Sequence, residues 1–427
     1  MTLNVLIQGW INVPHSYAIV NIYQILALLK HDNVNVYFQD VPKYNESWPI
    51  IDLDLLVDPH EKILLDNLQK KFLPKSINID VIYRISYPIN VIESSISNFK
   101  SDNPILIFYT SEFQMLPDSN FCFGYKSENT VGFNYFLEKC KNRTFIPITP
   151  SKWSSMALKR NGYDPLVIPH GVDTNKYFYS TKTRNQTREN FNIPKDAFVF
   201  LNIGAATPNK NVKSVIKAFY NLAKIKDNVY LVLKGIEGLY SCQDRIMVYI
   251  KELINEHVIE KKKWSSIRKR FIYIPDTFNY TEMNDLYNAC DTYVSPYIAE
   301  GFNMPVLEAL ACGLPVIVSE GGPTDDFTNQ DVALYPKTVS LKTTGLEERL
   351  QQYLLIVDDL SLQEKMLYVL NNPDFVSSIH KLGPELVSEK FTWDKVIDKL
   401  VNFFHLIEQE NYTKTQASKY NLRRIKN

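Results

Sequence analysis

The sequence predicts an α/β protein made of two successive domains, each with a parallel sheet. At 427 residues the chain is long for one domain and suits two domains of roughly 200 residues. Short β-branched or aromatic runs alternate with longer amphipathic stretches, beginning at residues 5–9, 18–30 and 34–40. This alternation is typical of βαβ units. It resumes at residues 197–204, 212–223, 229–235 and 271–274, which indicates a second sheet.

The boundary between the domains is expected where this alternation stops. Pro169, Gly171 and a polar, charged stretch interrupt the periodicity, which predicts an interdomain linker at residues 171–195. The N-terminal domain would then span residues 1–170 and the C-terminal domain residues 196–391. The alternation of strands and helices is Rossmann-like, but no Gly-x-Gly-x-x-Gly follows either opening strand. The absence of this motif argues against a nicotinamide dehydrogenase.

The C-terminal part of the chain is predicted to be helical after residue 341. Residues 346–355 and 396–408 show the clearest helical patterns. Residues 410–427 are polar and basic, and we expect them to form a frayed tail.

Composition limits the class of protein and its partners. Lys plus Arg and Asp plus Glu each number 47, so no global field favours nucleic acid or an anionic membrane. Five cysteines without a CxxC pair favour neither a disulfide framework nor a zinc site. The first 20 residues lack the basic start of a signal peptide, and no stretch of about 18 apolar residues is uninterrupted. We expect a cytoplasmic protein with at most peripheral membrane contact.

The stretch of residues 291–327 carries most of the chemistry. A short strand at residues 292–295 leads to Glu300 and Gly301, and a helix is predicted to begin at Met304 or Pro305. The unpaired N–H groups and the dipole of a helix N-terminus favour an anion. The pattern therefore predicts a diphosphate site at residues 301–305.

Two carboxylates flank this predicted anion site. Glu300 precedes the helix and Glu308 lies about one turn inside it, so both are placed to hold hydroxyl groups of one ligand. The alternative is that both are solvated charges at a helix start, where acidic residues are common in any case.

Residues 300–308 read Glu300-Gly-Phe-Asn-Met-Pro-Val-Leu-Glu308, and the next residues read Ala-Leu-Ala-Cys-Gly-Leu-Pro-Val-Ile. This stretch resembles the Glu-x7-Glu region of retaining glycosyltransferases of family 4. The resemblance implies the GT-B fold, in which two Rossmann-like domains with parallel sheets face a central cleft. It implies that Glu300 approaches the donor sugar and Glu308 binds the nucleotide ribose. The phosphates would be held by the backbone amides between the two glutamates, namely those of Gly301, Phe302, Asn303 and Met304.

A second stretch, FLNIGAATPNKNVKSVIKAF, resembles the Gly-Arg-…-Lys element of the same family. Lys210 falls on the phosphate-binding lysine of that element, whereas Ala205 stands where the family has arginine. Lys234, at the end of a predicted strand, is a candidate to supply the missing charge. A solvated lysine at a strand end is the alternative reading.

Three more stretches extend the resemblance. Residues 148–177 resemble the passage between the two domains, and residues 271–296 resemble the strand, helix and strand before the Glu motif. The sequence FTWDKVIDKLVNFF resembles the closing helix of the family. It implies that a helix from about residue 392 crosses back onto the first domain, with Trp393 as a packing anchor.

The N-terminal half offers weaker candidates for the acceptor side. Gly9 ends the first predicted strand and would allow a sugar or phosphate to approach the backbone. Glu112 follows a later strand and is a second catalytic candidate, with an ordinary loop carboxylate as the alternative. His170 lies in the predicted passage between the two domains, where a role in a turn or linker is favoured over that of a general base. The basic segment 260–271 is a candidate to contact an anionic membrane or a polyanionic acceptor, but a solvated connection between a helix and a strand is favoured.

Together these features predict transfer of a hexose-type sugar from a UDP- or GDP-sugar to a glycan, lipid or protein-linked acceptor. The resemblance implies retention of the anomeric configuration and no metal ion, and no cofactor is expected beyond the nucleotide sugar donor. Two alternatives stay open: a GT-B nucleotide-sugar epimerase, and a binding protein that has lost turnover because Ala205 replaces the arginine. A phosphorylase is disfavoured because its pyridoxal-phosphate lysine context and greater length are not evident.

Overall fold

The computed structural model describes most of the chain as two compact units. Of the described residues, the first unit contains those up to Gly171, those within 343–352 and those from Trp393 onward; the second unit contains those within 172–342 and 353–392. The described residues are 2–13, 15–41, 43, 48–71, 77–85, 105–115, 140–141, 145–235, 237, 239–344 and 351–409.

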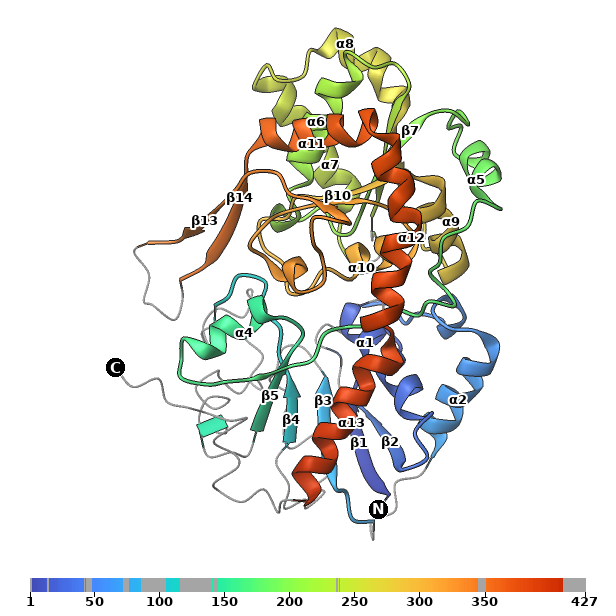
Figure 1. Ribbon diagram of the computed structural model, residues 1–427, viewed down its shortest axis with the longest axis vertical. Coiled ribbons are helices and arrows are strands. Elements are labelled where there is room, and N and C mark those ends of the chain that lie inside the picture. The colour runs from blue at the N-terminus through green and yellow to red at the C-terminus, as the bar shows by residue number, and fades with distance from the viewer. Residues whose placement is uncertain are drawn as a thin grey trace. The chain divides into compact units, whose positions relative to one another are not determined.

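The first unit is built on a six-stranded sheet in the order β2-β1-β3-β4-β5-β6, and every neighbouring pair is parallel. Strand β1 is buried along nearly all of its length, as expected when helices cover both faces of a parallel sheet. Figure 1 shows this sheet with its labelled helices around it. The bounds are β1 Leu3–Gly9, α1 Ser16–Leu28, β2 Val34–Asp40, α2 Pro59–Lys70, β3 Val81–Ile85, β4 Ile105–Phe108, β5 Phe145–Thr149, α4 Lys152–Lys159, β6 Leu166–Val167 and α13 Trp393–Gln409, with the 3₁₀ turn η1 at Leu53–Leu55.

Helix α13 comes last in the described chain and packs on α1 of the first unit. Trp393 stacks on Tyr23 with ring centroids 5.7 Å apart, and Phe404 meets Tyr83 edge to face. Lys30 and Asp394 form an exposed ion pair with a distance of 2.7 Å between nitrogen and oxygen. The helix expected at residues 396–408 is therefore confirmed, and Trp393 is buried as a packing residue.

The second unit repeats the plan with a parallel sheet in the order β12-β11-β10-β7-β8-β9. Helix α6 is strongly amphipathic and buries its apolar side against β8 and neighbouring helices. The strands are β7 Phe198–Ile203, β8 Val229–Lys234, β9 Phe271–Ile274, β10 Thr292–Ser295, β11 Val316–Val318 and β12 Ala333–Leu334. The helices are α5 Arg184–Asn190, α6 Val212–Ala223, α7 Cys242–Asn255, α8 Lys261–Ile267, α9 Tyr280–Ala289, α10 Met304–Ala311, α11 Asp359–Asn371 and α12 Pro373–Lys390, with 3₁₀ turns η3 Pro208–Lys210, η4 Arg268–Arg270 and η5 Pro323–Asp326.

Residues 172–195, expected as part of a linker, lie in the second unit. They include α5, which packs on α9. Arg188 is fully buried there and donates to Asp291 and to the backbone oxygens of Ala197 and Ala289. This segment is therefore fastened to the second sheet by a buried, hydrogen-bonded guanidinium. The expected tail at residues 410–427 lies outside the described residues.

The prediction of a helix at residues 346–355 is wrong where the structure describes it. Strand β14, Tyr353–Val357, pairs antiparallel with β13, Thr338–Lys342. Leu355 and Val357 are buried while Ile356 is exposed, which is the period of two of a strand. A short apolar run fits a helix or a strand equally well by pattern, and here the pairing partner decides.

Candidate functional site

Two loops meet at the carboxyl ends of the paired strands β7 and β10. Asn209 joins them: its backbone oxygen accepts from the N–H groups of Ile298, at 2.7 Å, and Ala299, at 3.3 Å. Its side-chain amide donates to the oxygen of Ala299 at 3.1 Å. The amide of Asn211 donates to Pro296 at 3.0 Å. The loop after β7 and the loop that carries Glu300 are therefore held as one structure.

Lys210 and Glu300 form an ion pair within this joined structure. Lys210 ends the 3₁₀ turn η3, and Glu300 is only 6% exposed. A buried carboxylate needs a cation or hydrogen-bond donors, and Lys210 supplies the charge. The structure thus brings together two residues that the sequence predicted separately for one donor site, Lys210 for the phosphates and Glu300 for the sugar.

Helix α10 begins at Met304, as predicted, directly after Asn303. Asn303 has the left-handed backbone conformation, with φ 77°, and its amide donates to Ser295 Oγ at 3.0 Å. Asparagine tolerates this conformation better than most residues. Phe302 stacks on Phe327 with centroids 4.8 Å apart, which fixes the chain between Gly301 and the helix. The first turn of α10 thus presents its N-terminal end beside Glu300.

Glu308 lies one turn into α10 and is partly buried. The hydroxyl of Tyr287, on α9, donates to Glu308 Oε2 at 2.7 Å. Burial raises the pKa of Glu308 to about 7, against the opposing effect of the Tyr287 hydrogen bond. This carboxyl therefore changes charge near neutral pH, which the sequence pattern did not indicate.

Lys234 ends β8 and is 7% exposed, so it is not the solvated lysine of the alternative reading. Its amine donates to the oxygen of Gly235 at 2.8 Å and lies over the ring of Phe278. Burial lowers its pKa, and the nearby carboxylate of Asp276 opposes this effect.

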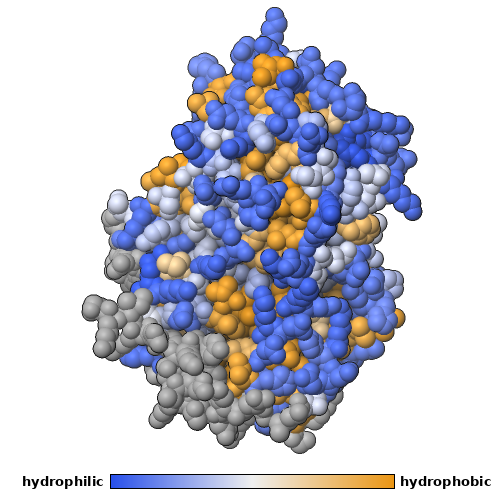
Figure 2. Space-filling model, in the orientation of Figure 1, coloured by the Kyte–Doolittle hydropathy of each residue, from blue (hydrophilic) through white to orange (hydrophobic). Residues whose placement is uncertain are grey.

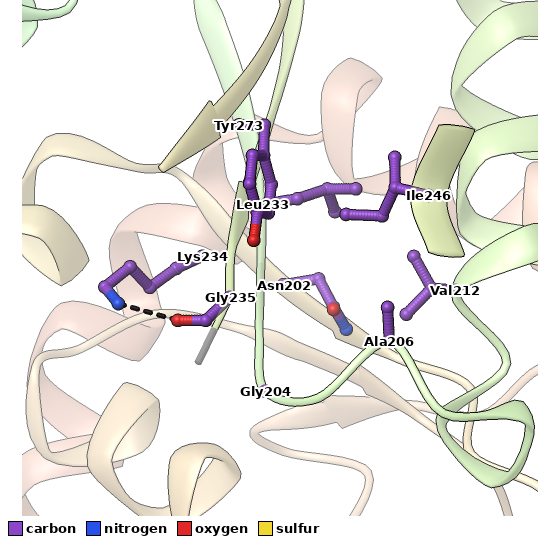
Figure 3. Close-up of a pocket in the computed structure, with 9 residues that line it drawn as sticks. All are labelled: Asn202, Gly204, Ala206, Val212, Leu233, Lys234, Gly235, Ile246 and Tyr273. Carbon is purple, nitrogen blue, oxygen red and sulfur yellow. Dashed lines mark hydrogen bonds between the residues drawn. The ribbon is translucent and has the colours of Figure 1, made fainter. Parts of the chain in front are cut away.

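Lys234 also lines a small pocket at the carboxyl ends of β7 and β8, drawn in Figure 3. The pocket has a volume of about 10 Å³, close to the smallest space that holds a water molecule. Gly204 and Ala206, which flank Ala205, line the same pocket, so Lys234 and the loop that lacks the arginine are neighbours. In Figure 3 the lysine chain extends away from Val212 and Ile246, on the other side of the strand.

The candidates of the N-terminal half lie in the first unit. Glu112 is partly buried, and its backbone oxygen accepts from the indole of Trp153 at 2.6 Å. His170 is buried between Phe108 and Trp393, and burial lowers its pKa to about 3. A histidine in that setting stays neutral and serves packing, in line with the structural role favoured from the sequence.

Gly9 ends β1, and other atoms fill the space next to its Cα. A Cβ there would lie 2.0 Å from the amide nitrogen of Asn21 and 2.4 Å from the oxygen of Ile85. Asn21 is fully buried and donates to the oxygens of Trp10 and Ile85. Packing alone therefore requires glycine at this position, and contact of Gly9 with a ligand stays a prediction.

The basic segment 260–271 forms α8, η4 and the start of β9. Lys261, Lys262 and Lys263 are exposed, while Arg270 donates to the backbone oxygens of Ala223 and Lys226. In Figure 2 blue residues predominate around the place where Figure 1 labels α8, with an orange group beside them. One of the basic residues thus has a structural task, and the lysines are solvated.

Sequence reasoning missed Asn209 and Tyr287, the residues that hold Lys210, Glu300 and Glu308 in place. Asn209 precedes Lys210 directly, but its role depends on contacts about 90 residues away, which no local pattern reports.

Two broader observations concern the described part of the chain alone. No helix there is long and apolar enough to cross a membrane. In the same residues no three His, Cys, Asp or Glu side chains gather as metal ligands would.

Comparison with known proteins agrees with this geometry. Residues 183–355 match the model of the family described as glycosyl transferases group 1. This part of the chain is similar to the group 1 glycosyltransferases. The matched range contains Lys210, Lys234, Glu300 and Glu308.

Relatives outside the family model are distant. An uncharacterized glycosyltransferase of Methanocaldococcus jannaschii is 22% identical over 222 residues, 51% of this chain and 47% of that protein. The lipopolysaccharide 1,2-N-acetylglucosaminetransferase of Salmonella typhimurium is 21% identical over 242 residues, 55% of this chain and 54% of the relative. The chain spans about half the length of these two curated relatives that it matches.

Solved structures resemble the chain over nearly its whole length. HepE of Anabaena, in complex with UDP and glucose, superposes with a TM-score of 0.61 at 16% identity, covering 95% of this chain and 100% of that one. The sucrose-phosphate synthase of Thermosynechococcus elongatus gives a TM-score of 0.62 at 16% identity, covering 95% and 99%. Together with the two six-stranded parallel sheets, one in each unit, this likeness shows the GT-B fold.

Proposed function

We propose that this chain transfers a hexose-type sugar from a UDP- or GDP-sugar to a glycan, lipid or protein-linked acceptor, with retention of the anomeric configuration. One observation carries the proposal: the Lys210–Glu300 ion pair lies beside the start of α10, with Glu308 one turn further along that helix. This arrangement offers a cation, a helix N-terminus and two carboxylates to a single ligand. A nucleotide diphosphate sugar has matching groups, namely a diphosphate, a ribose and a sugar with several hydroxyls.

The donor's diphosphate fits the first turn of α10. The dipole and the N–H groups of a helix start favour an anion, and Lys210 adds a positive charge. Negative charge grows on the diphosphate as the bond to the sugar breaks. Donors already fixed in place stabilise that charge without reorganising, which lowers the barrier for the leaving group. The amides of Gly301, Phe302, Asn303 and Met304 are the proposed contacts.

The two carboxylates have different tasks in this proposal. Glu300 is buried beside Lys210 and is assigned to the hydroxyls of the donor sugar, close to the reacting carbon. Glu308 is assigned to the ribose, as the resemblance to family 4 implies; its Oε2 accepts from Tyr287, so its Oε1 is the oxygen proposed to accept from a ribose hydroxyl. Glu112 stays a candidate for a catalytic role toward the acceptor. No metal ion has a step in this mechanism.

The names of the relatives support the donor and acceptor classes. The Salmonella relative acts on lipopolysaccharide, as its name states, and HepE was solved with UDP and glucose. A second relative, 25% identical over 190 residues, is named as a galactosyltransferase that uses UDP-galactose and a diphosphoundecaprenol-linked acceptor. These proteins favour a UDP-sugar and a lipid-linked or glycan acceptor for the chain.

The test is release of nucleoside diphosphate by the purified chain from a panel of UDP- and GDP-sugars, with and without a chelator. We expect turnover with at least one donor, loss of more than about 100-fold in Glu300→Gln, and near wild-type turnover in the exposed control Glu320→Gln. NMR of the product's anomeric proton reports retention or inversion. An isomerised nucleotide sugar would favour an epimerase, and tight binding without turnover would favour a binding protein. Full activity in Glu300→Gln would overturn the site assignment.

A further inference from the structure

Tyr287 is the one side chain that holds Glu308 by a hydrogen bond within the described residues. It lies on α9, is fully buried, and is bracketed by two other tyrosines. Tyr177 meets its ring edge to face with centroids 6.0 Å apart, and the ring of Tyr293 lies at 6.3 Å. A capping box at Asn279 and Glu282 fixes the start of α9. The phenol oxygen therefore has a defined position.

The hydroxyl of Tyr287 has two acceptors and one proton. Glu308 Oε2 lies at 2.7 Å, and the backbone oxygen of Pro305, in the first turn of α10, lies at 3.3 Å. When Glu308 is ionised, the proton points at the carboxylate, because a charged acceptor makes the stronger bond. When Glu308 is protonated, it can donate to the phenol oxygen, and the phenol proton turns to Pro305. Both protonation states are then satisfied without moving either side chain.

The charged and titratable groups around Glu308 are few. Tyr293 on β10 and Cys312 at the end of α10 lie near enough to interact with its charge, and burial raises the pKa of both. Glu300, on the preceding loop, interacts with Tyr293 and is paired with Lys210. On α12, which packs on α10, His380 interacts with Arg184 and Asp291 instead. Among the described groups, Tyr287 is thus the donor that favours the carboxylate form.

We propose that Tyr287 is a positioning residue for nucleotide binding, which holds Glu308 Oε2 so that Oε1 is presented to the hydroxyls of the nucleotide's ribose. This rests on the proposed function, because it takes Glu308 as the ribose ligand. A ribose hydroxyl donates to the ionised carboxylate, so binding selects that form. Nucleotide binding near neutral pH therefore releases a proton from Glu308 to solvent.

Tyr287→Phe tests this, with Tyr293→Phe as the matched control. Tyr293 is also fully buried and neighbours Tyr287, but its hydroxyl donates to the oxygen of Ile203 at 3.2 Å. UDP and GDP binding is measured by calorimetry from pH 5.5 to 8.5, in two buffers of different ionisation enthalpy. Subtracting the profile of Glu308→Gln removes the titration of the phosphates themselves.

For the wild type we expect affinity to rise about tenfold with pH across the titration of Glu308, with proton release that Glu308→Gln lacks. Tyr287→Phe should bind about tenfold more weakly at pH 7 and shift the profile to higher pH. Tyr293→Phe should keep the wild-type profile. An unshifted profile in Tyr287→Phe, or the same shift in both tyrosine variants, would overturn the proposal.

A second readout does not depend on nucleotide binding. The side-chain carboxyl of Glu308 is titrated by ¹³C NMR in the free protein and assigned by its absence in Glu308→Gln. We expect the midpoint to move to higher pH in Tyr287→Phe and to stay in Tyr293→Phe. If the wild type binds neither nucleotide yet the midpoint moves, the proposed function fails while the Tyr287–Glu308 coupling stands. If the midpoint does not move, the positioning role is wrong.

Discussion

Lys210 and Glu300, 90 residues apart in the chain, form an ion pair at the carboxyl edge of the second unit's sheet. The side chain of Glu300 is 8% exposed and that of Lys210 is 24% exposed. Asn209 ties the backbone next to both residues, so the two side chains start from positions that are fixed relative to each other. In the absence of a donor, the pair thus keeps each charge compensated at the position where the diphosphate is proposed to bind.

Removing Lys210 alone should cost more stability than removing both charges. Lys210→Met leaves a buried carboxylate without its cation, which we expect to lower the free energy of unfolding by about 2–4 kcal/mol. The double variant Lys210→Met with Glu300→Gln should recover at least half of that loss, because no buried charge remains. Urea denaturation at pH 7 measures both. Equal losses in the single and double variants would show that the pair carries no coupling energy.

Glu308 should make the free protein less stable as pH rises. Its pKa is raised from 4.5 to about 7, so the folded state binds the proton more tightly than the unfolded state. The stabilising effect of the neutral carboxyl is complete below pH 4.5 and is lost as pH rises to about 7. Glu308→Gln, which stays neutral, should therefore gain up to about 3 kcal/mol over the wild type at pH 8.

The measurement for Glu308 is the difference in unfolding free energy between Glu308→Gln and the wild type at pH 5 and at pH 8. Glu320→Gln, an exposed carboxylate on the loop after β11, serves as control and should show little difference at either pH. If the gain in unfolding free energy of Glu308→Gln over the wild type were larger at pH 5 than at pH 8, folding would not raise the pKa of Glu308 and the prediction would be wrong.

The sequence was sufficient for most of the elements that it predicted, because these depend on local patterns, and it named Lys210, Glu300 and Glu308 as candidates, whose roles stay predictions. The strands at residues 34–40, 271–274 and 292–295 and the helix at residues 212–223 have the predicted bounds. The Tyr353–Val357 strand was missed, since its five apolar residues carry no period of their own and need β13 beside them. The Lys210–Glu300 and Tyr287–Glu308 contacts and the raised pKa of Glu308 depend on tertiary packing, which no sequence window contains.

Lys234 should contribute to binding of the diphosphate if it replaces the charge missing at Ala205. We expect Lys234→Met to weaken UDP or GDP binding by about tenfold and to leave the weaker binding of the nucleoside unchanged, because only the diphosphate needs the cation. Lys226→Met, at an exposed lysine of the same unit, is the control and should match the wild type. Adding Ala205→Arg to Lys234→Met should restore part of the affinity. Equal weakening for nucleoside and diphosphate would mean that Lys234 supports the fold rather than the phosphates.

Gly9 should be intolerant of any side chain, whatever its role toward a ligand. In Gly9→Ala the new Cβ would meet the Asn21 amide at 2.0 Å and the Ile85 oxygen at 2.4 Å, far inside van der Waals contact. The end of β1 must then shift, and we expect a loss of roughly 2–3 kcal/mol in unfolding free energy. Asn21→Ala clears the first clash but not the second, because the Ile85 oxygen belongs to the backbone of β3. Gly9→Ala should therefore remain costly in the Asn21→Ala background, as thermal and urea unfolding of the four proteins would show; a rescued double variant would place the constraint on the Asn21 side chain alone.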